Sequence, residues 1–169
     1  MAHKQDVLEL LVGDHRETER MFAAFEASRD PVRRRELVDL VVAGLERHSA
    51  AEEEHLYPVV RRVLPDGDEI AARELAEHAE VGRTIDALDG ADPTDTAFAR
   101  DVATLMRQVQ EHVVEEENEV FPRLRAALTP GERAELGARA MDPGAGATGP
   151  RAGLADRVRA WLTGRTHLM

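Results

Sequence analysis

Hydrophobic side chains recur at helical spacing over most of the chain and mark out four long segments. The first covers about residues 4–29, where the apolar positions fall on one helical face: Val7, Leu8, Leu11, Met21, Phe22 and Phe25. The others cover about 31–64, a stretch ending near Leu88, and 96–128. No stretch has the alternation of a strand. Because the connections are short, the pattern predicts an all-α antiparallel four-helix bundle with short C-terminal helices.

Turn-forming residues separate these segments. Asp30 and Pro31 supply an N-cap and a proline at the first helical position of the second segment. The stretch "PDGDE" (65–69) precedes the third segment, and "DGADPTD" (89–95) reads as the next loop. The stretch "TPGE" (129–132) has the pattern of a capping box, which predicts a short further helix to about Met141.

The composition changes after Met141. The stretch "DPGAGATGPRAG" (142–153) reads as a linker. Beyond it, an apolar stripe predicts an amphipathic tail helix: Leu154, Val158, Trp161 and Leu162. We therefore expect one domain over 1–141, followed by a linker and tail helix over 142–169. The tail either docks on its own bundle or contacts a membrane or a partner.

Composition and charge narrow the class of protein. Of the 169 residues, 43% are hydrophobic and 33% charged, as in a globular chain with one real core. The net charge of −11 predicts that neither nucleic acid nor an anionic membrane is the main partner. The absence of cysteine excludes disulfides, iron–sulfur clusters and thiolate-bound haem. No signal peptide or membrane span is read, so we expect a cytoplasmic protein.

One pattern occurs twice, 64 residues apart. "HSAAEEEHLYPVVRRVLPDG" (48–67) is matched by "HVVEEENEVFPRLRAALTPG" (112–131), and both begin H-x-x-x-E-E-E. On a helix, residues four apart share a face, so each copy places a histidine beside a glutamate: His48 with Glu52, and His112 with Glu116. A single such pair is ordinarily a solvated surface pair.

Two further histidines favour a metal site over solvated pairs. His15 and His78 lie midway along the first and third segments, 63 residues apart. Antiparallel packing can bring all four histidines and both glutamates to one level of the bundle core. Burying such groups is unfavourable unless metal ions or hydrogen bonds satisfy them. Imidazole and carboxylate together suit iron, manganese or zinc, so the duplicated pattern predicts a dinuclear site.

The chain resembles the hemerythrin-like (HHE cation-binding) domains over about residues 5–128. The resemblance rests on "DHRE" around His15, "HSAAEEEHLYP", "EHAE" around His78, and "HVVEEENEVFP". It implies a hemerythrin-like bundle with two non-haem iron ions joined by an oxo or hydroxo bridge. Oxygen-carrying hemerythrins have a second histidine on the third helix, whereas Gly82 follows His78 at that spacing. The pattern H…HxxxE…H…HxxxE is similar to an actinobacterial or mycobacterial-type subgroup.

Other residues are weaker candidates for ligands. Glu52 and His55 mimic the Glu-x-x-His of ferritin-type sites, although the repeat carries Glu119 in place of His55. Oxygen carriers have H-x-x-x-x-D on the fourth helix, which makes Glu117 an alternative to Glu116. Glu19 would be a further ligand if it pointed inward. The remaining acids of the two repeats are expected to form a solvated face: Glu53, Glu54, Glu115 and Glu117.

Tyr57 has two interpretations. In a regular helix it points away from Glu52 and is a core or interface ring. However, Pro58 removes a backbone hydrogen bond and disfavours α geometry at the residue before it. Such a distortion would turn the phenol toward the metal, where it would act as a ligand. Phe121-Pro122 has the same shape without the oxygen.

The expected ligands are His15, His48, Glu52, His78, His112 and Glu116, with Tyr57 as a seventh. Bridging glutamates and a phenolate favour a diferric resting state with an open position. We therefore expect a protein that reacts with hydrogen peroxide or related species, in a catalase-like manner, with Glu52, Glu116 and Tyr57 taking part in catalysis. The alternative is a non-catalytic protein that senses, carries or stores oxygen, nitric oxide or iron. A structural bundle with vestigial ligands is a third interpretation.

Overall fold

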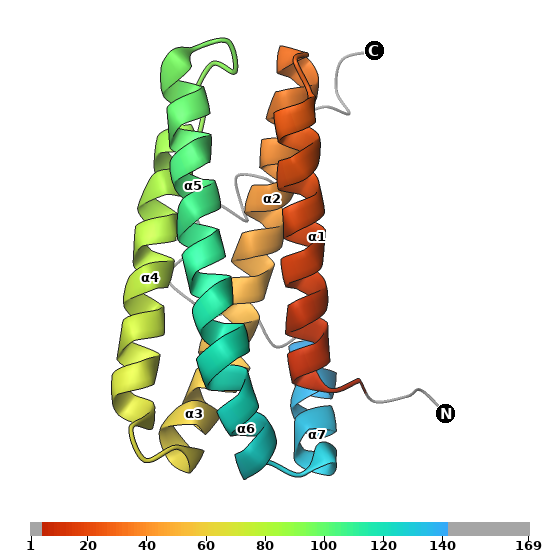
Figure 1. Cartoon of the computed structure of the whole chain (residues 1–169), viewed down its shortest axis with the longest axis vertical. Coiled ribbons are helices and arrows are strands. Elements are labelled where there is room, and N and C mark those ends of the chain that lie inside the picture. The colour runs from red at the N-terminus through yellow and green to blue at the C-terminus, as the bar shows by residue number, and fades with distance from the viewer. Residues whose placement is uncertain (1–4, 142–169) are drawn as a thin grey trace, which may run out of the picture.

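Four long helices form an antiparallel bundle, and two of them contain a π-helical turn (Figure 1). The computed structural model describes residues 5–141. The first and third helices are uninterrupted: α1 (Val7–Ala27) and α4 (Gly67–Leu88). The second is α2 (Pro31–Ala51), η1 (Glu52–Leu56) and α3 (Tyr57–Val63). The fourth is α5 (Thr96–Glu115), η2 (Glu116–Val120) and α6 (Phe121–Ala127). The described residues contain no strand, which confirms the predicted all-α fold.

The helix ends follow the predicted capping residues. The Asp30 side chain accepts a hydrogen bond from the backbone N–H of Val32, and Pro31 opens α2. Thr129 and Glu132 form the predicted capping box of α7 (Pro130–Ala140). Helix α1 begins at Val7, a few residues later than predicted, because Asp6 is its N-cap.

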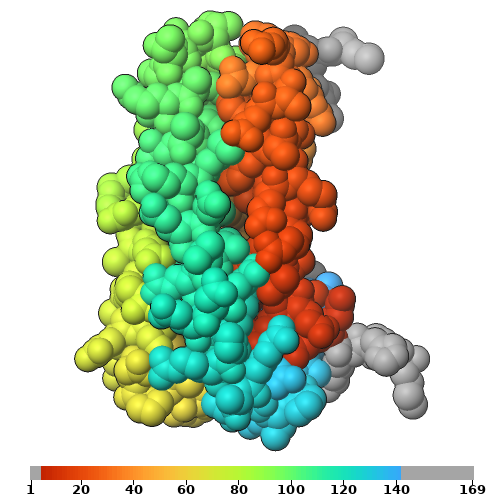
Figure 2. Space-filling view, in the orientation of Figure 1, coloured from red at the N-terminus to blue at the C-terminus, as the bar shows by residue number. Residues whose placement is uncertain are grey.

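The fifth helix, α7, packs against the start of α1 at one end of the bundle. Figure 2 shows it beneath α1 on the face where α1 and α5 lie in front. Gly137 makes this close approach, since a Cβ at this position would lie 2.0 Å from the backbone oxygen of Gln5. Only glycine permits that contact without a shift of the backbone.

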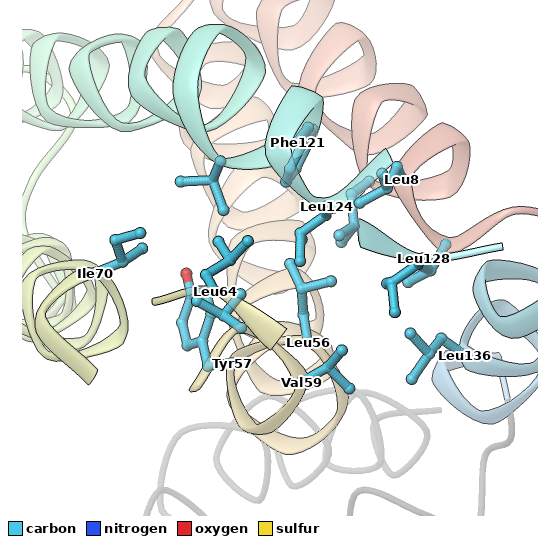
Figure 3. Close-up of a cluster of buried hydrophobic side chains, with 14 of the residues drawn as sticks. Leu8, Leu56, Tyr57, Val59, Leu64, Ile70, Phe121, Leu124, Leu128 and Leu136 are labelled. Carbon is cyan, nitrogen blue, oxygen red and sulfur yellow. The ribbon is translucent and has the colours of Figure 1, made fainter. Parts of the chain in front are cut away.

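The hydrophobic core has two parts, one at each end of the bundle. One part includes Leu8, Leu56, Tyr57 and Leu124, and the phenol of Tyr57 is its only polar side-chain group (Figure 3). The other part is built around the contact of Phe25 with Phe98. A layer of buried polar residues lies between the two parts. One level of the bundle interior is therefore polar.

The structure does not test two predictions, the tail helix and the domain boundary after Met141. The linker and the predicted tail helix, residues 142–169, are not among the described residues. The domain boundary after Met141 therefore stays a prediction. Within residues 5–141, every helix is too short or too polar to cross a bilayer.

Candidate metal centre

All six predicted histidine and glutamate ligands are buried in the polar layer. Each of the four long helices contributes one histidine, and the second and fourth also contribute a glutamate four residues later. Glu52 and Glu116 are 0% exposed. The convergence of these six side chains was expected from the repeat, and the structure confirms it.

His15 and His48 form one half of the centre with both glutamates. The Nε2 atoms of His15 and His48 lie 3.2 Å apart. The nearest carboxylate oxygens lie 3.1 Å from His48 Nε2, on Glu52, and 3.3 Å from His15 Nε2, on Glu116. Two nitrogens that bind one transition-metal ion about 2.1 Å away at a right angle are separated by about 3 Å. The four donors are therefore spaced to hold one ion.

His78 and His112 form the other half in the same way. Their Nε2 atoms are 3.3 Å apart, and Glu52 Oε2 lies 3.3 Å from His78 Nε2. The Oε2 atom of Glu116 lies 3.6 Å from His112 Nε2. Each glutamate therefore contacts histidines of both halves. This is the arrangement that two bridging carboxylates require.

Several carboxylate oxygens in this layer have no hydrogen-bond partner among the described residues. They are Glu52 Oε1, Glu74 Oε2 and both oxygens of Glu116. Histidine nitrogens lie 3.1–3.6 Å from some of these oxygens without forming a hydrogen bond. A buried carboxylate oxygen that makes no hydrogen bond is strongly unfavourable, because the water that would solvate it has been removed. Cations would satisfy these atoms and the inward-facing imidazole nitrogens together. The residues therefore fit a pair of metal ions.

The outer nitrogen of each histidine contacts a carboxylate. Nδ1 of His15 lies 2.8 Å from Glu117, and Nδ1 of His78 lies 2.9 Å from Glu53. These two pairs are related by the repeat. The prediction that Glu53 and Glu117 belong to a solvated face is therefore incomplete, because each is only partly exposed and contacts a buried imidazole. Such a carboxylate fixes the tautomer that presents Nε2 to a metal.

The histidines of the second and fourth helices are supported in the same way, by acids of the first and third helices. Nδ1 of His48 lies 3.4 Å from Asp14, and Nδ1 of His112 lies 2.9 Å from Glu77. Asp14 and Glu77 each directly precede a histidine of the centre in the sequence. All four imidazoles are thus held from outside by an acid of a neighbouring helix.

Strong electrostatic coupling shifts the pKa values of the buried groups. Burial alone would lower the pKa of His48, but the charges of Glu52 and Glu116 and the hydrogen bonds to Asp14 and Glu52 together outweigh burial and raise that pKa to about 10. Burial and the nearby charge of Glu52 raise the pKa of Glu116 to about 7. Although burial opposes ionisation, the surrounding histidines hold the pKa of Glu52 well below its usual value. In the absence of metal the cluster therefore retains protons that a metal ion would displace.

Each of the two π-helical turns begins at a glutamate of the polar layer and ends just before an aromatic-proline pair. The backbone N–H of Tyr57 donates to the carbonyl of Glu52, and that of Phe121 donates to Glu116. A π turn holds about one residue more than the 3.6 of an α turn, so a residue five positions on faces the same side. The Tyr57 hydroxyl accordingly lies 3.4 Å from Glu52 Oε2 and 3.1 Å from His78 Nε2. Its role as a ligand stays a prediction.

Glu74 is a component of the centre that sequence reasoning missed. It lies on α4 four residues before His78, is 0% exposed, and its Oε2 is 3.1 Å from His112 Nδ1. Glu74, His112 and Glu116 are close enough to share an ion. Its i,i+4 spacing from His78 is the signal of it in the sequence. In the other half of the repeat, Leu11 occupies the equivalent position.

The remaining candidates lie outside the groups of residues that could share an ion. His55 is only 13% exposed in its side chain, and its ring lies 3.9 Å from Glu54 rather than in the polar layer. Glu19 is 54% exposed and pairs with Arg16 on the surface. Glu117 contacts the outer nitrogen of His15, so its position is that of a supporting carboxylate.

Fold and site together define a helical-bundle protein with a buried histidine–carboxylate metal centre. The chain belongs to the hemerythrin family, since residues 6–124 match the model described as "Hemerythrin HHE cation binding domain". This confirms the family resemblance, while the actinobacterial subgroup stays a prediction. No solved structure matches the chain.

One relative corrects a prediction that was drawn from the net charge. A protein of Nostoc sp. named "DNA nickase" is 32% identical over 126 residues, which cover 74% of this chain and 34% of the relative. The chain thus spans about a third of that relative's length. The exclusion of nucleic acid as a partner is contradicted by this relative. Net charge sums the whole surface and says little about a local patch or a further domain, so it was a poor basis for the exclusion.

Proposed function

We propose that this chain binds two iron ions and disproportionates hydrogen peroxide. The observation that carries the proposal is the pair of fully buried carboxylates, Glu52 and Glu116, which contact histidines of both halves and retain oxygens that make no hydrogen bond. Imidazole nitrogens and carboxylate oxygens in one site suit iron. Bound iron would supply the two-electron redox chemistry: one peroxide gives up two electrons and leaves as dioxygen, and another accepts them and leaves as water.

Different residues of the chain would hold different parts of such a centre. Four imidazoles present Nε2 inward, and Glu52 and Glu116 join the two halves. Tyr57 and Glu74 place two further oxygen donors near the His78–His112 half, with no counterpart at the His15–His48 half, where Phe121 stacks on His15. Anionic donors stabilise the more highly charged ferric ion, which supports peroxide chemistry over reversible oxygen carriage.

An oxygen electrode tests the proposal directly. Iron-loaded protein is expected to evolve one dioxygen for every two peroxides added, over many turnovers and without a reductant. Glu52→Ala and Glu116→Ala are expected to abolish the reaction, because each removes a carboxylate shared by both halves. Glu54→Gln is the matched control, since Glu54 is exposed and lies in the same turn as Glu52.

The same experiment separates the enzyme from a non-catalytic binder. A sensor or carrier would rest in the diferrous state, take up dioxygen reversibly and evolve none from peroxide. That result, obtained with protein that contains its full complement of iron, would replace the catalytic proposal with binding, sensing or storage.

A second candidate function is an action on DNA, and the name of the Nostoc relative supports it. In that case the iron-loaded chain would convert supercoiled plasmid to the nicked circle, and Glu52→Ala would stop the conversion. Added catalase and a radical scavenger would exclude strand breaks made by free iron and peroxide. Plasmid that stays supercoiled under these conditions would rule out nicking by this chain.

A further inference from the structure

A small cavity adjoins the metal centre on the side of the core that contains Phe25 and Phe98. The four histidines of the centre form part of its wall, and the rest comes mainly from apolar residues of that core. Its volume is about 20 Å³. A cavity needs about 10–15 Å³ to hold one water molecule, so this one has room for a molecule of about that size. Access to the metal centre through this cavity is therefore restricted to very small molecules.

The sequence repeat extends to the wall of this cavity. Leu45 on α2 corresponds to Val109 on α5, and both contribute to the wall. Thr18 on α1 corresponds to Val81 on α4 in the same way. Threonine and valine have nearly the same shape, so this pair differs mainly by one hydroxyl group. Ser49 on α2 also lines the cavity and corresponds to Val113 on α5, so both hydroxyl groups come from the helices that carry His15 and His48. Thr18 is the more deeply buried of the two residues.

The Thr18 hydroxyl has no hydrogen-bond partner within residues 5–141, although the residue is only 6% exposed. A threonine inside a helix ordinarily satisfies its hydroxyl by donating to the carbonyl four residues earlier. Thr84 and Thr104 of this chain do so, with Glu80 and Arg100 as acceptors. Thr18 lies three residues after His15 and does not. The hydroxyl is therefore available to donate a hydrogen bond to a molecule in the cavity, water included.

We propose that the Thr18 hydroxyl donates a hydrogen bond to the end of a small anion, such as peroxide or azide, that is held at the metal centre and reaches into this cavity. The inference rests on the proposed function, because it needs a metal centre that holds such an anion. The cavity limits the size of the anion, and the hydroxyl selects for a hydrogen-bond acceptor over an apolar diatomic molecule. Valine at this position would keep the shape of the cavity and lose the selection.

Azide titration of the iron-loaded protein, followed by its optical spectrum, tests the inference without relying on turnover. Thr18→Val is expected to retain iron and the thermal stability of the apo-protein, since Val81 already fills the equivalent place. Its azide dissociation constant is expected to rise roughly tenfold, as for the loss of one hydrogen bond to a charged group. Thr18→Ser should restore most of the affinity, and Thr84→Val, on the surface of α4, should change nothing.

The outcomes distinguish this inference from the function on which it rests. Equal azide affinity in wild type and Thr18→Val, with iron bound in both, overturns the role of Thr18 and leaves the metal centre in place. A Thr18→Ser variant that binds azide as weakly as Thr18→Val also overturns it, because the hydroxyl is then not the cause. Wild-type protein that binds no iron overturns the proposed function and the inference together.

Discussion

The backbone N–H of Tyr57 donates its hydrogen bond to the carbonyl of Glu52, five residues earlier rather than four. The next residue, Pro58, has no N–H to continue the α-helical pattern. The extra residue in the turn rotates the phenol onto the face of the helix that bears Glu52, and the hydroxyl reaches His78 Nε2 at 3.1 Å. A local irregularity of the backbone thus brings a core ring to the metal centre. Such π turns are frequent at functional sites.

The first prediction concerns the Tyr57 oxygen. If the phenolate binds ferric iron, the loaded protein will show a visible charge-transfer band, and Tyr57→Phe will lose that band while it retains iron. Burial and the neighbouring carboxylates raise the pKa of Tyr57 far above its usual value, so a metal ion must displace the proton. Phe121 shows that the fold accepts a ring without oxygen at the equivalent place. An unchanged spectrum in Tyr57→Phe would make Tyr57 a packing residue.

A second prediction concerns stoichiometry. About two irons should bind per chain, as in other bundle sites with paired carboxylates. His48→Ala and His112→Ala should each remove most of both, because Glu52 and Glu116 contact both halves. Metal analysis of the purified variants provides the measurement. A variant that retains one tightly bound iron would show that the halves bind independently.

Glu74 and Glu77 provide a third, paired prediction. Both approach Nδ1 of His112, but Glu74 is fully buried whereas Glu77 is partly exposed. Glu77→Gln should weaken iron binding about tenfold, as expected for loss of a supporting carboxylate. Glu74→Leu should weaken it further and change the Mössbauer signal of one iron only, while the fold is kept because Leu11 fills the equivalent position. Equal effects of the two substitutions would assign Glu74 a supporting role.

The fourth prediction is a pH dependence of the apo-protein. The pKa of His48 is raised from 6.5 to about 10, so its contribution to stability is complete below 6.5 and lost through pH 10. The pKa of Glu116 is raised from 4.5 to about 7, so its contribution is complete below 4.5 and lost through pH 7. The unfolding temperature of apo-protein should therefore fall by several degrees or more between about pH 5 and pH 10.

Iron-loaded protein provides the control for this pH dependence. Metal ions take the place of the protons, so its unfolding temperature should stay nearly level from pH 7 to pH 10. Differential scanning calorimetry of both forms in matched buffers gives the comparison. Parallel curves for the two forms would mean that these groups are not where the metal binds.

Much of the fold and the convergence of the six histidine and glutamate side chains could be predicted from the sequence alone. Helix boundaries depend on local chemistry, such as Asp30 before Pro31 and the capping box at Thr129, which is complete within a few residues. The pairing of His48 with Glu52 depends only on the number of residues per turn of one helix. The repeat then related these residues to His112 and Glu116 without any knowledge of packing.

The tertiary structure decided which of the other polar residues take part. Glu74, Glu53 and Glu117 are three among 33 acidic residues, and their spacing from the histidines along one helix does not by itself separate them from the solvated ones. Whether such a side chain is buried depends on how each helix is rotated and shifted against its neighbours, which residues far apart in the chain determine together. The distortion at Tyr57 was predicted from Pro58, but the contact of its hydroxyl with His78 depends on a second helix. The position of Thr18 beside the cavity likewise depends on helices in contact, so a helix considered alone does not contain it.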